Sequence, residues 1–122
     1  MRDWYFPFNW NLERLWVLDV PVETRHIAEL RWHFDVPIWS VRKGMHFDLC
    51  PAEVIQNHGH HPRHDDRIEK TDVAYPIEIM LTVDRCAIID GVHRLAKYEK
   101  MGLTKVQVRI IPREMISLFR TD

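Results

Sequence analysis

The sequence lacks a long apolar run and a surplus of charge of either sign, and it contains few cysteines. No stretch approaches the roughly 18 apolar residues of a membrane-spanning helix, so we expect no membrane span. Lysine and arginine number 17 against 18 aspartates and glutamates, which leaves a formal net charge of −1. Nucleic-acid binding normally uses a basic face, and this composition gives no electrostatic argument for one.

The two cysteines and the first residues bear on the cellular compartment. Cys50 and Cys86 stand in unrelated contexts without the spacing of a metal site, and we expect both to be reduced, buried thiols. The segment Met1–Trp4 contains an early acid and not the apolar centre of a signal peptide. These features predict a cytoplasmic protein.

What the chain does contain is an ordinary globular composition with aromatic residues near its start. Hydrophobic residues make up 46% and charged residues 29% of 122 positions, which predicts one domain over residues 1–122. The aromatic range 1–14 has no clear period, and we expect an arm that covers the core or contacts a second subunit. A homodimer is therefore an alternative to a monomer.

Apolar periodicity and turn residues predict the secondary structure in chain order. The expected strands are Leu15–Val20, Phe47–Cys50, Ile77–Thr82, Cys86–Ile89 and Lys105–Ile111. The expected helices are Val22–Arg31, one that opens at Pro51, Pro62–Lys70, Gly91–Met101 and Pro112–Phe119.

The chain is organised around a strand, a turn and a helix within residues 87–98. Ala87 to Ile89 is a short apolar run rich in β-branched residues, which is typical of a buried strand. Gly91 permits a sharp turn, and the helix that follows ends at Gly102. Because a helix N-terminus presents unpaired N–H groups and a positive dipole end, this turn predicts a phosphate-binding site.

His93 and Arg94 add donors and charge to the first turn of this helix. Cations at that position oppose the dipole and cost on the order of a few tenths of a kcal/mol unless an anion lies nearby. The plainer interpretation is a structural turn with Asp90 as the N-cap. That interpretation does not account for the cationic pair, so we favour the phosphate site.

From about Tyr75 to Pro112 the chain resembles the ParB/sulfiredoxin fold family. In that family a strand is followed by a second strand that ends in a G-x-[HR]-R-x-x-A phosphate motif, then a helix and a strand. The motif falls within Ile88–Ala96 here. The resemblance implies an α/β (α+β) fold with a small mixed β-sheet and packed helices, with Ile88 and Ile89 central in the sheet.

The residues of the motif separate three branches of this family. Val92 stands where sulfiredoxins carry the reacting cysteine, so we expect no sulfinate reduction. His93 stands where chromosome-partitioning ParB proteins carry an arginine, and we expect no DNA-reading module after the last strand. The range 90–94 matches the D-G-x-H-R form of the branch that includes free serine kinases.

Resemblance to this branch implies a small phosphotransferase that uses ATP or ADP, with Mg²⁺ as a candidate cofactor, and acts on a small hydroxyl-bearing metabolite. The expected phosphate-binding residues are Gly91, Val92, His93, Arg94, Arg67 and His64. The expected catalytic residues are Asp90, His93 and Asp35, with Glu29 as a second candidate for the base. The expected acceptor pocket consists of Trp32, His33 and Trp39.

Two other functions stay open at this point. One is a non-catalytic nucleotide-binding regulatory module that keeps the phosphate turn. The other is a DNA-associated nuclease of the same fold, which the near-neutral charge disfavours.

The histidine-rich range 58–64 invites a metal-binding interpretation, because imidazole suits zinc, nickel and iron. Gly59 and Pro62 interrupt the segment, and no third ligand is placed for a pair of its histidines. We therefore expect a loop that leads into a helix, and no native metal site.

Overall fold

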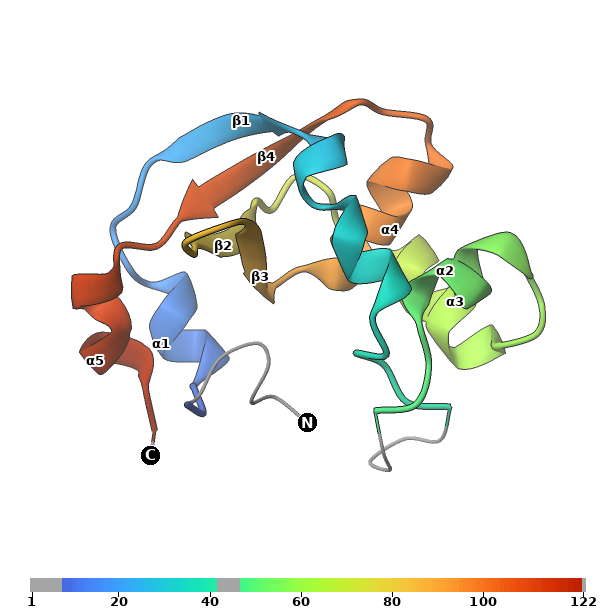
Figure 1. Cartoon of the computed structure of the whole chain (residues 1–122), viewed down its shortest axis with the longest axis horizontal. Helices are drawn as coiled ribbons and strands as arrows, with labels where there is room; N and C mark the ends of the chain where they lie inside the picture. Colours follow the sequence, from blue (N-terminus) through green and yellow to red (C-terminus); the bar gives the residue numbers. More distant parts are fainter. Residues whose placement is uncertain (1–7, 42–46, 122) are drawn as a thin grey trace.

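A computed structural model describes residues 8–41 and 47–121 of the chain, and the first half of the predicted N-terminal arm lies outside these ranges (Figure 1). Its sheet has four strands in the order β1-β4-β2-β3. These are β1 Val22–His26, β4 Lys105–Ile110, β2 Ile77–Leu81 and β3 Cys86–Asp90. The pairs β1/β4 and β2/β3 are antiparallel and β2/β4 is parallel, so the predicted α+β class with a mixed sheet is confirmed.

The helices form two groups at opposite ends of the sheet (Figure 1). The group near the chain ends contains α1 Leu12–Trp16, the 3₁₀ turn η3 Arg113–Met115 and α5 Ile116–Phe119. The other group contains the 3₁₀ turns η1 Ile27–Glu29 and η2 Arg31–Asp35 with α2 Pro51–Gln56, α3 Pro62–Lys70 and α4 Val92–Lys100. Within the described ranges, every helix is too short or too polar to cross a membrane.

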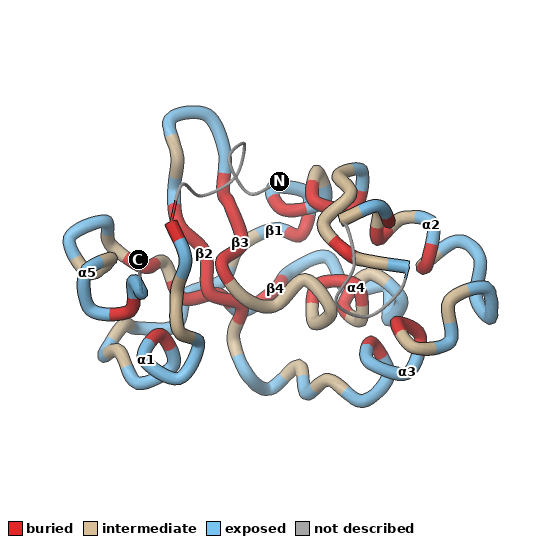
Figure 2. The backbone as a smooth tube through the Cα atoms, turned by 90° about the horizontal axis from the view of Figure 1, so that it is seen from below, coloured by how far each residue is buried: buried red, intermediate tan, exposed pale blue. Residues whose placement is uncertain are grey.

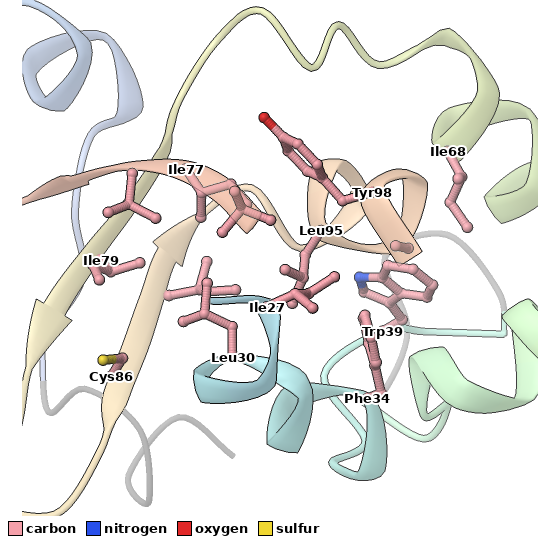
Figure 3. Close-up of a cluster of buried hydrophobic side chains, with 14 of the residues drawn as sticks. Ile27, Leu30, Phe34, Trp39, Ile68, Ile77, Ile79, Cys86, Leu95 and Tyr98 are labelled. Atoms are coloured by element: carbon pink, nitrogen blue, oxygen red, sulfur yellow. The ribbon is translucent and has the colours of Figure 1, made fainter. Parts of the chain in front are cut away.

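Each face of the sheet packs on its own apolar cluster. Ile88 belongs to the larger cluster, in which Trp39 and Leu95 of α4 also point inward (Figure 3). Its neighbour Ile89 belongs to the second cluster, with Leu15 of α1. Figure 2 shows the buried segments along β2, β3 and α4. Because successive strand residues face opposite sides, β3 is buried on both faces.

Several predicted elements are confirmed. Helix α3 covers Pro62–Lys70 as expected, with Pro62 in its first turn, and α2 opens at Pro51. The predicted strands at 77–82, 86–89 and 105–111 and the helices at 91–101 and 112–119 match to within a few residues, although the last one begins with the turn η3.

Three predicted elements are wrong. Residues 12–16 are helical where Leu15–Val20 was expected to be a strand, because the Asn11 side chain accepts a hydrogen bond from Arg14 N–H at 3.0 Å and caps α1. The expected helix Val22–Arg31 is instead strand β1 followed by η1. The expected strand Phe47–Cys50 contributes one isolated bridge, between Leu49 and Trp39.

The expected central position of Ile88 and Ile89 is also wrong, because β3 is an edge strand. Side chains of η2 cover that edge: Trp32 Nε1 donates to the Cys86 carbonyl at 2.9 Å, and Ile88 N–H donates to His33 Nε2 at 3.0 Å. A continuous apolar run is equally compatible with a central strand and with a covered edge strand. On this point the topology departs from what the family resemblance led us to expect.

Candidate functional site

An open cleft of about 1170 Å³ lies where β3 ends and α4 begins. Residues from both helical groups and from three strands line it, so the cleft joins segments that are far apart in the sequence. The residues that line it include Trp10, Trp16, Trp39, Arg67, Tyr75, Glu78, Asp90, Gly91, Val92, His93, Arg94 and Arg109.

Gly91 makes the turn into α4 with φ of +122°, a conformation that L side chains rarely adopt. A Cβ at this position would lie 3.1 Å from Ile77 Cγ2 and 3.3 Å from Arg94 Cζ. No side chain caps α4, and its first backbone bond runs from Leu95 N–H to the Gly91 carbonyl. The N–H groups of residues 92–94 therefore have no partner in the described ranges, and they form an anion-binding end.

Arg94 does not offer its charge to the cleft. Its Nη2 lies 2.8 Å from Asp90 Oδ2 and 3.7 Å from Glu78 Oε1, and its Nη1 donates to the Pro76 carbonyl. On the other side, Arg109 Nη1 donates to Glu78 Oε2 at 3.1 Å. The chain itself thus supplies two carboxylates that neutralise Arg94, so this cation requires no external anion.

Glu78 lies in the middle of this ion-pair chain and is paired in register with Asp90 on β3 and Arg109 on β4. Its Oε1 is buried and has no hydrogen-bond partner in the described part of the chain. Burial raises the pKa of the Glu78 carboxyl above its usual range, although Arg94 and Arg109 act in the opposite direction. The site therefore holds a carboxylate in a poorly solvated position.

Asp90 keeps one oxygen open. Its Oδ2 accepts hydrogen bonds from Arg94 and from Trp16 Nε1, both at 2.8 Å. Its Oδ1 has no partner among the described residues and is not one of their buried unpaired atoms. Trp16 and Arg94 thus fix the carboxylate at one oxygen while the other can accept a hydrogen bond or a cation.

His93 of α4 and His64 of α3 form a stacked group with Trp39. The Trp39 ring lies 4.1 Å from the His93 ring and 4.7 Å from the His64 ring, between centroids, with interplanar angles of 13° and 6°. His93 Nε2 lies 3.1 Å from His64 Nδ1, and His64 Nε2 lies 2.7 Å from the Ser40 carbonyl. This arrangement fixes the planes and the spacing of both imidazoles.

Both imidazoles are neutral at pH 7. Burial, with Arg67, His64 and Arg63 nearby, lowers the pKa of His93 to about 3. Burial also lowers the pKa of His64, against the raising effect of its bond to Ser40 and with Arg63, Arg67 and His61 adding to the decrease. The expected role of His93 as a positive charge in the phosphate site therefore does not fit its lowered pKa.

Arg67 is the cation that remains. Its guanidinium has no ion pair or hydrogen bond within residues 8–41 and 47–121, although it lines the cleft. Burial and neighbouring Arg63 lower its pKa, while Asp90 acts in the opposite direction. Arg67 is exposed, so its guanidinium is accessible to a ligand in the cleft, and such a group binds a phosphate or carboxylate.

Most of the predicted phosphate-binding residues line the cleft. His64 does not line it but contacts His93, which does. It does not bring the predicted acceptor residues Trp32 and His33 to the cleft, because both side chains cover the edge of β3. Asp35 is exposed at the end of η2, outside the cleft lining. Glu29 pairs with Arg25 at 3.0 Å.

Sequence reasoning missed Glu78, Arg109 and the tryptophans before residue 20. One signal for Glu78 was present, because a lone carboxylate inside the apolar strand Ile77–Leu81 needs a buried partner. Nothing local identified Arg109 as that partner.

The described residues contain no group of three histidine, cysteine or acidic side chains that could hold a metal ion. In the histidine-rich range, His58 Nδ1 lies 3.6 Å from Asp65 Oδ1 and His61 Nε2 lies 3.9 Å from Glu53 Oε2. No family model, curated protein or solved structure matches the chain. The geometry of the cleft is therefore what indicates a function for this chain.

Proposed function

We propose that the cleft binds ATP or ADP and that the protein transfers a phosphoryl group to a small hydroxyl-bearing metabolite. One observation supports this proposal: the N–H groups of residues 92–94 and the Arg67 guanidinium, which have no partner within residues 8–41 and 47–121, border the same cleft as the open oxygen of Asp90. Donors select an anion, and an open carboxylate oxygen selects a hydroxyl or a cation.

The phosphates would bind at the N-terminus of α4, with Arg67 as the neutralising cation. Phosphoryl transfer requires chiefly that developing negative charge be stabilised and that the reactants be held in line. In this proposal Arg94 has a different role from the one first expected, since it orients Asp90 instead of touching phosphate.

The aromatic side chains of the cleft support a nucleotide as the ligand. Trp16 is 52% exposed and Tyr75 is 66% exposed, and Trp10 lines the same cleft. Such rings bury large apolar areas and stack on flat ligands. The volume also accommodates a ligand of nucleotide size, since typical ligand sites measure roughly 300–1,000 Å³.

Asp90 Oδ1 fits a Mg²⁺ ion that arrives with the nucleotide, because Mg²⁺ commonly takes one or two carboxylates together with substrate phosphates. A bound Mg²⁺ would supply charge neutralisation on the phosphates. A cytoplasmic location belongs to the same proposal, and the two free cysteines agree with it.

A second candidate is a regulatory module that binds nucleotide without chemistry. The observation in its favour is that Arg94, a cation of the phosphate motif, is fully engaged by Asp90, Glu78 and the Pro76 carbonyl. A ParB-like DNA-associated protein is the third reading, and the formal charge of −1 gives it no support. Formation of a phosphorylated product separates the first two.

Calorimetric titration with ADP, followed by an assay of ADP and phosphate-ester formation from ATP with small hydroxyl-bearing metabolites, tests the proposal. Arg67→Gln should weaken ADP binding roughly tenfold or more, because it removes a charge-assisted bond. Lys70→Gln on the same helix is the matched control, since Lys70 pairs with Asp66 at 3.1 Å outside the cleft lining. Equal affinity in both variants would locate the anion elsewhere, and wild-type protein that binds ADP without forming a phosphate ester would favour the regulatory module.

A further inference from the structure

We propose that His64 is a positioning residue that holds His93 in the Nε2-protonated tautomer, so that His93 Nδ1 accepts the proton of the ligand hydroxyl. This inference rests on the proposed function and assigns to His93 a role as a neutral acceptor. It also requires that the metabolite that receives the phosphoryl group carry a hydroxyl group within reach of the N-terminus of α4.

The tautomers follow from the direction of the hydrogen bonds. The Ser40 carbonyl can only accept, so the proton in its 2.7 Å bond belongs to His64 Nε2. Arg63 Nη2 donates to the same carbonyl at 2.8 Å and lies 3.3 Å from His64 Nε2. Because both nitrogens donate to one oxygen, this longer contact between them follows from the shared acceptor, and the shorter bond to Ser40 assigns the proton to His64 Nε2. A neutral His64 then has a bare Nδ1, and its 3.1 Å contact with His93 requires that His93 Nε2 carry the proton.

The same reasoning leaves a lone pair on His93 Nδ1. This nitrogen has no partner among the described residues, and it is not one of the buried side-chain atoms that lack one. It is therefore accessible, on a ring that lines the cleft three residues after Asp90. A 180° turn of the ring about its Cβ–Cγ bond would keep it parallel to Trp39 but would break the contact between His93 Nε2 and His64 Nδ1.

His93 Nδ1 accepts the proton that the transfer releases. As the hydroxyl oxygen forms its bond to phosphorus, the O–H bond breaks and its proton moves to His93 Nδ1. The bond between phosphorus and the nucleotide oxygen breaks, and its electron pair leaves with the nucleotide. The resulting imidazolium lies beside the new phosphate ester, and the proton returns to water when the product leaves.

The charges around the ring agree with this role once an anion is present. In the empty cleft Arg63 and Arg67 oppose protonation of His93. A phosphate dianion bound at α4 offsets these charges and raises the pKa of His93 toward neutrality, where a general base is most effective. Asp90, the nearest carboxylate of the turn, is held by Arg94 and Trp16 and stays available for Mg²⁺.

The experiment combines nitrogen NMR of the histidine side chains with the assay of phosphate-ester formation. In wild-type protein we expect His93 to show a protonated Nε2 and a bare Nδ1. His64→Phe keeps a ring against Trp39 but removes both bonds, so His93 should lose its fixed tautomer. Formation of the phosphate ester should fall at least about tenfold while ADP affinity changes less than about threefold. His60→Phe, in the adjoining exposed loop, is the control.

The outcomes separate this inference from the proposed function. A wild-type protein that binds no ADP contradicts the proposed function, whereas the tautomer of His93 is still read from the same sample. A wild-type spectrum with the proton on His93 Nδ1 overturns the inference without any variant. Active wild-type protein with an equally active His64→Phe variant overturns it as well.

Discussion

The edge of β3 and its carboxyl end each meet a histidine whose pKa is lowered, His33 fully buried and His93 half-buried, but the two histidines differ in which ring nitrogens they leave open. At the edge, His33 has no exposed surface, and both ring nitrogens are engaged, Nδ1 by the Leu30 carbonyl at 2.7 Å and Nε2 by Ile88 N–H at 3.0 Å. At the carboxyl end, His93 engages Nε2 and leaves Nδ1 free within the described ranges.

The surroundings of the two histidines differ in the same way. At the covered edge, Trp32 Nε1 pairs with the Cys86 carbonyl and His33 Nε2 with Ile88 N–H, so these contacts contribute to stability. Within the described ranges, the carboxyl end leaves three backbone N–H groups, the Arg67 guanidinium and the Asp90 Oδ1 atom without a protein partner. Arg67 is exposed and Asp90 Oδ1 is not a buried atom, so both are accessible to a ligand at the site that we propose.

The largest expected effect of a substitution is a loss of stability at the edge of β3. His33→Leu should lower the free energy of unfolding by roughly 2–5 kcal/mol, since it leaves Ile88 N–H and the Leu30 carbonyl buried without partners. ADP affinity should stay unchanged. Denaturant unfolding measures the first effect and calorimetry the second, with exposed His26→Leu as the control. A loss of ADP affinity that matches the loss of stability would contradict the separation of the two regions.

Acid should remove the contribution of His33 to stability. Burial lowers the pKa of His33 to about 4, with Arg85 adding to the decrease against the Leu30 bond, while the unfolded chain retains the ordinary 6.5. The unfolded state therefore binds more protons between these values, and the contribution present above pH 6.5 is lost as the pH falls toward 4. The loss amounts to about 3 kcal/mol at about 1.36 kcal/mol per pKa unit.

The measurement is denaturant unfolding of wild-type protein and His33→Leu at a series of pH values. The wild-type free energy of unfolding should fall more steeply than that of the variant between pH 6.5 and 4. Parallel curves would mean that His33 is not held neutral at the edge.

A smaller loss of stability, with loss of binding, is expected at the turn. Gly91→Ala forces a Cβ against Ile77 in a left-handed backbone conformation, which costs roughly 1–3 kcal/mol and displaces the N–H groups of α4. Gly102→Ala is the control, because φ is +74° there but no atom lies within 4 Å of the added Cβ. Only Gly91→Ala should abolish ADP binding in calorimetry; equal binding in both variants would dissociate the turn from the site.

Local sequence signals predicted the turn at Gly91, the helices that begin at Pro51 and Pro62, and the strand–helix–strand order around α4. Each depends on a glycine or proline at a defined position or on a strong apolar period. The Asn11 cap of α1 was an equally local signal that sequence reasoning overlooked.

The remaining features depend on contacts that no local pattern encodes. The edge position of β3 is set by pairing with β2 alone and by His33, which contacts Ile88 from 55 positions away. Arg109 and Glu78 meet across 31 positions. An aromatic-rich segment such as Trp32–His33 has the same composition whether it covers an edge or forms a pocket. Sequence reasoning expected it in the acceptor pocket, whereas the structure places both side chains at the edge of β3 and outside the cleft lining.

The central claim, that the end of β3 is the ligand site and its edge is not, is tested most directly by mapping backbone amide shifts during titration with ADP. The account predicts the largest shifts at Val92, His93 and Arg94, whose N–H groups would receive the phosphates, and negligible shifts at His33 and Ile88. Shifts centred on the edge of β3, or spread evenly over the chain without a maximum at the start of α4, would contradict it.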